Sequence, residues 1–276
     1  MENISKNKIR ESVMENYKRV ALQNETRKNS QAECCEPSST STKSSCCGSS
    51  DTNIVDNISH KLGYSSEEYN NVPEGSNMGL GCGNPQAIAS LKKGETVLDL
   101  GSGGGFDCFL ASKSVGETGK VIGIDMTPEM ISLARNNAEK GAYKNTEFRL
   151  GEIEYLPVAD TSIDVIISNC VINLSPEKEQ VFKEAYRVLK PGGKLAISDV
   201  ILSAELPPNI KNDLILYSGC VGGASTIAEI QNILKASGFS GIKIEPNQKS
   251  REFIKDWAPE RGIEDYIVSA TIEAVK

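Results

Sequence analysis

The chain is poor in histidine and in long apolar runs, and each scarcity excludes a class of protein. A single histidine, His60, and the lack of any Cys-x-x-Cys pair rule out the usual zinc-finger spacings. No apolar run reaches the roughly 18 residues that a membrane-spanning helix needs. The first 20 residues also lack the apolar core of a signal peptide. We therefore expect a cytoplasmic protein with no membrane partner.

An excess of positive charge is also missing. The formal net charge is −7, whereas nucleic-acid-binding proteins usually carry a basic patch and a high isoelectric point. We therefore expect no nucleic-acid partner. The 276 residues, of which 38% are hydrophobic and 24% charged, suffice for one large globular domain with its own core.

Cysteine is present but sparse. Eight cysteines are far below the density of a disulfide scaffold, and in a reducing compartment such residues are more often buried, metal-binding or catalytic than bridged. Half of them form two adjacent pairs inside residues 29–52, a Ser/Thr-rich segment too poor in apolar side chains to fold, which we expect to be flexible. These four are Cys34, Cys35, Cys46 and Cys47. Residues 1–28 carry apolar side chains at helical spacing and are expected to form an amphipathic helix.

From residue 95 onward, short apolar runs alternate with helical patterns. Seven strands are expected in or around residues 96–100, 121–125, 148, 164–168, 195–201, 242–244 and 266–274. Helix starts are marked at Thr127-Pro128, at Ser175-Pro176 with a helix to Leu189, and at Thr226 with Glu229. This alternation predicts an α/β fold in which a mostly parallel sheet has helices on both faces.

A glycine-rich turn, Asp99-Leu-Gly101-Ser-Gly103-Gly-Gly105, joins the first strand to the next helix. Such a turn brings backbone N–H groups and a helix N-terminus to a ligand. Phe106 stands where the dinucleotide fingerprint requires glycine, and no phosphate-binding lysine follows, so neither that fingerprint nor a P-loop is present. Asp125 ends the next strand, 20 residues beyond Gly105, where a carboxylate can accept both hydroxyls of a ribose. With Gly151–Glu154 placed to flank an adenine, these features predict a nucleotide-type cofactor.

Two cysteines stand in loops rich in Gly, Asn or Ser. Cys170 lies in Ser-Asn-Cys-Val-Ile-Asn-Leu, and Cys220 lies in Ser-Gly-Cys-Val-Gly-Gly. Ligands of open α/β sheets bind outside the carboxyl ends of the strands, so both thiols are expected beside the cofactor. Sulfur ligands select soft, thiophilic elements. Cys108, in contrast, lies on the apolar stripe of a helix and is expected to be a small core residue.

These motifs resemble those of a known family. The chain is similar to class I S-adenosylmethionine-dependent methyltransferases in Asp99–Gly105, Asp125, Gly151–Glu154 and the strand ending in Asn169. It resembles, more narrowly, the arsenite methyltransferases in three cysteine motifs, Gly79–Pro85, Ser168–Leu174 and Gly219–Gly223. The resemblance implies a Rossmann-like, seven-stranded methyltransferase domain over residues 53–245, completed by a helix and strand in residues 246–276. It also implies that S-adenosylmethionine is bound by Asp99, Gly101, Gly103, Gly105, Asp125, Met126, Glu152, Ile153 and Asn169.

The same resemblance implies that Cys82, Cys170 and Cys220 hold trivalent arsenic, supplied as arsenite or its thiol conjugate. Trivalent arsenic is soft and takes up to three thiolates, and its lone pair can then attack a sulfonium methyl group without a general base. One cysteine of the N-terminal segment, for which Cys47 is favoured among the four, is expected to pair with Cys82 and reduce the arsenic afterwards. An external dithiol reductant would reset that disulfide, a role for which the resemblance implies thioredoxin or glutathione.

Two other interpretations stay open. A class I methyltransferase of another small molecule, such as a quinone precursor, would need a base or an acidic acceptor and has no use for three loop thiols. A thiol-based binder of soft metals would hold the metalloid without methyl transfer, and no DNA-binding motif supports a regulator. Incubation with methyl-labelled cofactor, with and without arsenite, separates these interpretations.

Overall fold

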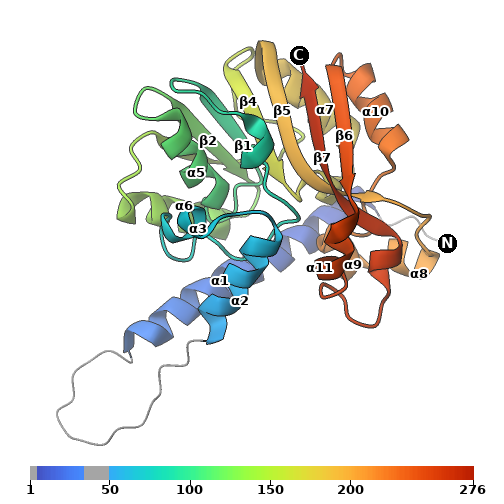
Figure 1. Ribbon diagram of the computed structural model, residues 1–276, viewed down its shortest axis with the longest axis horizontal. Coiled ribbons are helices and arrows are strands. Elements are labelled where there is room, and N and C mark those ends of the chain that lie inside the picture. Colours follow the sequence, from blue (N-terminus) through green and yellow to red (C-terminus); the bar gives the residue numbers. More distant parts are fainter. Residues whose placement is uncertain (1–4, 34–49) are drawn as a thin grey trace, which may run out of the picture.

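The computed structural model describes residues 5–33 and 50–276 and is organised around one sheet (Figure 1). Within these residues the sheet has seven strands, in the order β3-β2-β1-β4-β5-β7-β6. Their bounds are β1 Thr96–Leu100, β2 Lys120–Asp125, β3 Thr146–Leu150, β4 Ile163–Asn169, β5 Leu189–Leu202, β6 Ser240–Asn247 and β7 Ile267–Val275. Strands β1 to β5 run parallel, and β7 lies antiparallel between β5 and β6. The predicted Rossmann-like, mostly parallel α/β fold is confirmed.

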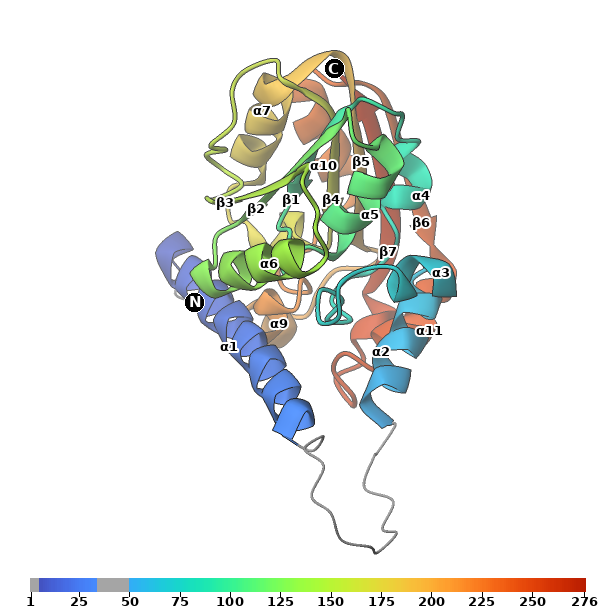
Figure 2. The ribbon, with the colours of Figure 1, turned by 90° about the vertical axis from the view of Figure 1, so that its left-hand side faces the viewer.

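Helices cover both faces of the sheet, as Figure 2 shows with α7 and α10 on one side and α5 on the other. One buried cluster joins the sheet to α7 and α10, and a second joins its opposite face to α5 and α6. The helices are α1 Lys6–Glu33, α2 Ser50–Lys61, α3 Ser66–Asn70, α4 Gln86–Ala89, α5 Phe106–Val115, α6 Pro128–Lys140, α7 Lys178–Val188, α8 Pro208–Lys211, α9 Leu214–Ser218, α10 Ile227–Ala236 and α11 Arg251–Ile254. Short 3₁₀ turns span Ile172–Leu174, Gln248–Ser250 and Ile263–Asp265.

Local capping signals account for two of the three predicted helix starts. Thr226 and Glu229 form a reciprocal capping box at the start of α10, and Pro128 is the first residue of α6. The predicted start of α7 at Ser175 is wrong, because α7 begins at Lys178. The Ser175 hydroxyl donates to Glu154 Oε1 at 2.6 Å and accepts the N–H of Glu177, the residue before the helix, at 3.0 Å. The helix also ends one residue before Leu189, where β5 begins.

Helix α1 lies across the edge of the sheet where the parallel strands end, packed on α6 and α9 (Figure 1). Its inner side chains are buried, with Val13 and Ala21 each 1% exposed. The helix continues to Glu33, and α2 begins at Ser50. All four cysteines of the N-terminal segment, including Cys47, lie outside the described residues. In the described parts of the chain, no helix combines the length and the apolar character needed to cross a membrane.

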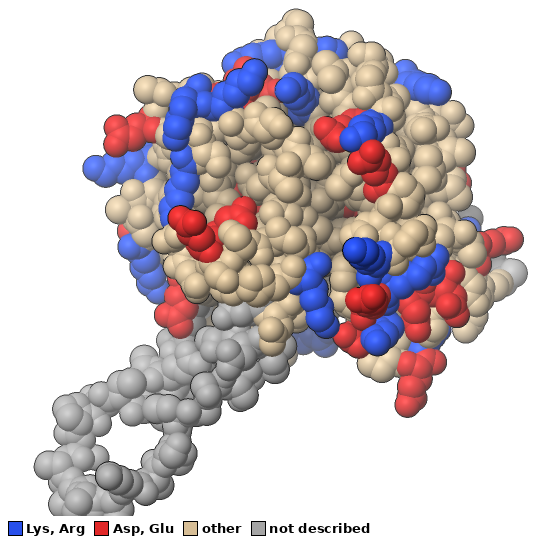
Figure 3. All heavy atoms as spheres, in the orientation of Figure 1, with Lys and Arg blue, Asp and Glu red and all other residues tan. Residues whose placement is uncertain are grey.

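The expected division after residue 245 falls inside β6. Strand β6 pairs with β7, and β7 pairs with β5, so the segments on both sides of this boundary belong to one sheet. On the face seen in Figure 3, acidic and basic side chains are interspersed. Pairs such as Lys243 with Glu245, at 3.1 Å, are more than half exposed and therefore add little to stability.

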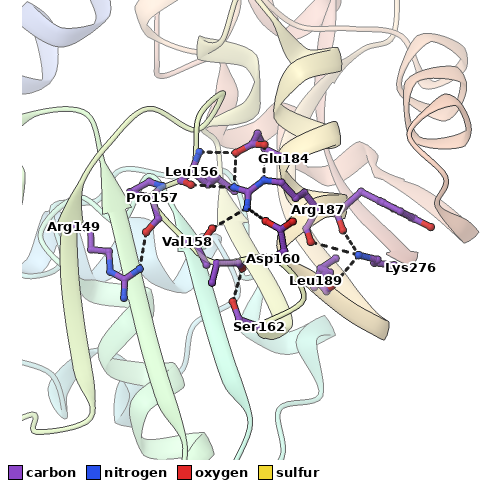
Figure 4. Close-up of polar contacts among 12 residues, drawn as sticks. Arg149, Leu156, Pro157, Val158, Asp160, Ser162, Glu184, Arg187, Leu189 and Lys276 are labelled. Carbon is purple, nitrogen blue, oxygen red and sulfur yellow. Dashed lines mark hydrogen bonds and ion pairs between the residues drawn. The ribbon is translucent and has the colours of Figure 1, made fainter.

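The loop between β3 and β4 is anchored by Arg187 of α7 (Figure 4). The guanidinium donates to the carbonyls of Leu156, at 3.1 Å, and Val158, at 2.9 Å, and forms an ion pair with Glu184 at 2.7 Å. Glu184 in turn accepts the backbone N–H of Leu156 at 2.8 Å. One arginine therefore satisfies several polar groups of a loop whose first residues reach the functional site.

Candidate functional site

A cavity of about 370 Å³ opens at the carboxyl ends of β1, β2 and β4. Its walls come from the glycine turn after β1, the end of β2, the loop after β3 and the end of β4, and α1 closes it with Arg10 and Tyr17. Parallel sheets place ligands at this edge, because the loops after neighbouring strands diverge there.

The glycine turn and Asp125 form one preorganised unit. Gly101 and Gly103 adopt φ of 72° and 50°, and a Cβ on Gly101 would lie 2.4 Å from Val171. The Gly103 N–H donates to Asp125 Oδ2 at 3.0 Å, and the Thr127 N–H donates to Oδ1 at 2.8 Å. Burial nevertheless raises the pKa of Asp125, the two N–H bonds acting in the opposite direction.

Most of the predicted cofactor residues line this cavity, but two do not. Those that line it are Asp99, Gly101, Gly103, Asp125, Met126, Ile153 and Asn169. Gly105 instead caps the start of α5 at φ 94°, where a Cβ would lie 2.7 Å from Phe109. The Glu152 side chain is 47% exposed and lies 4.0 Å from Arg10 Nε. Glycine at 105 is therefore required for packing at the helix start.

Cys170 and Cys220 also line this cavity. Cys170 directly follows β4, and Cys220 follows α9. Both have left-handed backbones, at φ 60° and 65°, which costs a residue with a side chain on the order of 1 kcal/mol. Cys220 Sγ donates to the Cys170 carbonyl oxygen at 2.7 Å. The two loops thus bring together thiols that are 50 residues apart in sequence.

Cys82 completes the group from behind the cavity wall and is itself 1% exposed. Its Sγ, Cys170 Sγ and a carboxylate oxygen of Asp199 all lie within 4.8 Å of one another. All three are buried, and Cys82, Cys108, Cys170 and Cys220 are free thiols in the described part of the chain. The structure thus brings together the three cysteines that the sequence motifs single out.

The negative charge of this cluster falls on Cys170. Hydrogen bonds from the thiols of Cys220 and Cys82 lower the pKa of Cys170 to about 5, against the effect of its burial. The same contacts raise the pKa of Cys220, with burial adding to the effect, and burial raises the pKa of Cys82. One thiolate supported by two thiols is an arrangement suited to a soft, thiophilic ligand.

Cys108 is a core residue, as predicted, and is fully buried. Its Sγ donates to Asp99 Oδ2 at 3.2 Å. Burial raises the pKa of both groups, with the Asp99 charge contributing at Cys108 and the Asp107 charge at Asp99. Cys108 therefore satisfies a buried carboxyl and lies apart from the cysteine group at the cavity.

Sequence reasoning missed several residues of the site. Arg10 and Tyr17 of α1 line the cavity, and so does Trp257. Burial and the nearby Cys220 and Cys170 raise the pKa of Tyr17 well above its usual value. The available signal in the sequence was that Tyr17 places a polar hydroxyl on the apolar stripe of the predicted N-terminal helix.

Asp199, near the carboxyl end of β5, was also missed. Its carboxylate accepts the N–H groups of Ile172 at 2.9 Å and Val200 at 2.8 Å, and the Asn173 amide at 2.8 Å. Burial raises its pKa well above the usual value, and the charge on Cys170 adds to the shift. Asp199 thus holds the loop that presents Cys170.

Comparison with known proteins shows which class of protein this chain belongs to. A family model described as a methyltransferase domain matches residues 91–238, more than half of the chain. Its match covers the glycine turn, Asp125 and the two cysteine loops after β4 and α9. The fold and cavity thus mark a methyltransferase domain.

Individual relatives are more specific. The chain is 55% identical over 218 residues to an arsenite methyltransferase of Halobacterium salinarum, covering 79% of this chain and 56% of the relative. It is 42% identical over 188 residues to that of Mus musculus, covering 64% and 49%. A crystal structure of an arsenic(III) S-adenosylmethionine methyltransferase from Chlamydomonas reinhardtii matches at 35% identity and TM-score 0.60, covering 79% of this chain and 73% of that one. The chain belongs to the arsenite methyltransferase family, and it spans about half the length of the curated relatives it matches.

Proposed function

We propose that this chain transfers a methyl group from S-adenosylmethionine to thiol-bound trivalent arsenic. The observation that carries the proposal is that Cys170 and Cys220 line the same cavity as a nucleotide-type glycine turn and Asp125, while the Cys82 sulfur lies within 4.8 Å of that of Cys170. The names of the relatives support it, because they are arsenite methyltransferases.

The residues of the cavity fit this cofactor. Asp125 spends only part of its acceptor capacity on two N–H groups, so it can still accept ribose hydroxyls. The Ser102 hydroxyl lines the cavity, is buried, and has no hydrogen-bond partner among the described residues, as expected where a ligand supplies one. When bound, S-adenosylmethionine supplies a methyl group on a positively charged sulfur. The remaining residues that we assign to it all line the cavity and are Asp99, Gly101, Gly103, Met126, Ile153 and Asn169.

The thiols bind and orient the substrate. Arsenite or its thiol conjugate exchanges its ligands for Cys170, Cys220 and Cys82, and the thiol protons leave with the displaced hydroxide or thiolate. The arsenic lone pair then points away from the three sulfurs and carries no proton, so attack on the methyl group needs no general base. The protein contributes by positioning, which can supply several kcal/mol of the barrier.

A reduction step is proposed between rounds. Methylation leaves arsenic formally pentavalent, and two thiols return it to the trivalent state by giving two electrons and forming a disulfide. We assign Cys82 and, from the N-terminal segment, Cys47 to that pair. An external dithiol reductant, with thioredoxin or glutathione in this role, then reduces the disulfide. Such chemistry requires a reducing compartment, as in the cytoplasm.

Methyl transfer to arsenic is the test of this proposal. The purified chain is incubated with methyl-labelled S-adenosylmethionine and a dithiol, with arsenite or without any acceptor, and methylated arsenic is separated by chromatography. Labelled methylarsenic is expected only with arsenite. Arsenite binding without label transfer would instead make the chain a soft-metal binder. Label transfer to an organic acceptor alone would make it a different small-molecule methyltransferase.

A further inference from the structure

The backbone of Cys82 is held on both sides by side chains from distant strands. Its N–H donates to Asn169 Oδ1 at 3.1 Å, and its carbonyl oxygen accepts from the Ser269 hydroxyl at 2.6 Å. Asn169 Nδ2 also donates to the next carbonyl, that of Gly83, at 2.8 Å. Asn169 ends β4 and Ser269 lies in β7, so two strands of the rigid sheet grip one loop.

Glycines on either side of Cys82 allow this grip. Gly81 adopts φ 140°, and a Cβ there would lie 2.9 Å from the Asn169 amide. A Cβ on Gly83 would lie 3.0 Å from Ser198. The distance at Gly81 is shorter than real Cβ contacts and the one at Gly83 is at their tight end, so glycine at both positions lets the loop lie this close to the strand ends.

The Asn169 side chain is itself fixed from below. Its Nδ2 lies 3.0 Å from the Tyr64 hydroxyl and 3.4 Å from Asp107 Oδ2, and the Tyr64 hydroxyl donates to Asp107 Oδ1 at 2.8 Å. All its polar atoms are engaged by the protein. Asn169 lines the cavity, and its hydrogen bonds are made to the loop of Cys82, to Tyr64 and to Asp107.

We propose that Asn169 and Ser269 are positioning residues that fix Cys82 as the third sulfur ligand of trivalent arsenic. This inference rests on the proposed function. Cys170 and Cys220 do not depend on the clamp, because they contact each other directly and are set by their own loops. The Cys82 thiol contacts the Cys170 thiol, and the backbone bonds to Asn169 and Ser269 set where the loop presents that thiol.

Two arsenicals that differ in the number of exchangeable ligands separate the roles of the thiols. Arsenite can take three thiolates, whereas phenylarsine oxide carries one phenyl group and takes two. Both are titrated against the full-length chain in which Cys34, Cys35, Cys46 and Cys47 are replaced by serine. In Ser269→Ala the arsenite affinity is expected to fall about fivefold or more, the usual effect of losing one buried hydrogen bond. The affinity for phenylarsine oxide is expected to stay within about twofold, since it needs only Cys170 and Cys220, whose contact with each other does not involve Ser269.

The matched control is Ser112→Ala in α5, which removes another buried serine hydroxyl, one that donates to Asn145 Oδ1. It is expected to leave both affinities unchanged. A double-mutant cycle adds a reading that a general loss of stability would not give: in a Cys82→Ser background, Ser269→Ala should have no further effect on arsenite. Unchanged arsenite affinity in Ser269→Ala, equal weakening of both arsenicals, or an effect that persists without Cys82 would each overturn the clamp.

A measurement without arsenic distinguishes failure of the clamp from failure of the proposed function. The rate at which iodoacetamide alkylates Cys82 is followed by peptide mapping, relative to Cys108 in the core. Ser269→Ala is expected to raise that ratio several-fold, because the loop is freed on one side. An unchanged ratio overturns the clamp even if arsenite binds. A raised ratio in a chain that binds no arsenite supports the clamp and removes the proposed function.

Discussion

Cys170 and Cys220 hold a left-handed backbone that glycine adopts more easily. Glycine would relieve this cost, on the order of 1 kcal/mol at each position, but would remove the sulfur. Non-glycine residues in this conformation cluster where a side chain is needed at a turn. The backbone strain is therefore an argument for the thiols that is independent of sequence similarity.

Replacing either cysteine tests that argument. Cys170→Ser and Cys220→Ser keep the side-chain size but substitute a hard oxygen for a soft sulfur. Arsenite methylation is expected to fall to background, while S-adenosylmethionine affinity, measured by calorimetry, stays within about twofold. Methylation at the parental rate in either variant would contradict the assignment.

Asp125 belongs to the same scale. Asp125→Ala removes the acceptor expected for the ribose and also frees the N–H groups of Gly103 and Thr127. Cofactor binding is expected to weaken by about 1.5–3 kcal/mol, the scale of charged hydrogen bonds. Isothermal titration gives the value, with Asp160→Ala as the control because that exposed carboxylate lies outside the cavity. An affinity equal to that of the parent would remove Asp125 from the site.

At the scale of elements, the loop between β3 and β4 depends on α7. Arg187→Ala leaves the carbonyls of Leu156 and Val158 and the carboxylate of Glu184 without their donor. The free energy of unfolding is expected to fall by about 2 kcal/mol, because these bonds involve a charged group that is only 30% exposed.

Urea denaturation measures this loss, and Lys243→Ala serves as the control. Lys243 pairs with Glu245 and Glu273, but its side chain is 55% exposed, so its removal is expected to cost much less stability than the removal of Arg187. Equal effects of the two substitutions would show that the Arg187 contacts do not stabilise the loop.

At the scale of the whole molecule, stability depends on pH through two buried acidic groups whose pKa values are shifted in opposite directions. Burial raises the pKa of Asp107 to about 6, so the folded chain holds a proton there that the unfolded chain has lost. This contribution to stability is complete below about pH 4 and is lost as the pH rises through about 6. The pKa of Cys170 is lowered from 9.0 to about 5, so its contribution to stability is complete above about pH 9 and is lost as the pH falls toward 5.

Asp107→Asn isolates the first of these effects. The amide does not titrate, so between pH 5 and pH 7 the variant is expected to lose about 1 kcal/mol less stability than the parent. Urea unfolding of both chains at the two pH values, without ligands, gives the difference. The same pH dependence in both chains would show that Asp107 does not hold its proton near neutral pH.

Features whose interacting residues lie close together in the chain can be predicted from the sequence alone. The capping box of Thr226 and Glu229, the glycine turn and the carboxylate ending β2 were readable because their partners lie within a few residues or at a standard spacing. The alternation of strands and helices predicted the sheet for the same reason. The helix predicted from Ser175 begins three residues later, at Lys178, and the contact of the Ser175 hydroxyl with Glu154, 21 residues away, is one that no local pattern shows.

The contacts that hold the cysteines in place can be seen in the tertiary structure but not in the sequence. Cys82 is bonded to Asn169 across 87 residues and to Ser269 across 187. No spacing rule connects residues so far apart, since their proximity depends on the order in which the strands assemble. For the same reason α1 could be predicted as a helix, but not as the wall that brings Tyr17 into the cavity. Local sequence determines which side chains are available, and the sheet topology determines which of them meet.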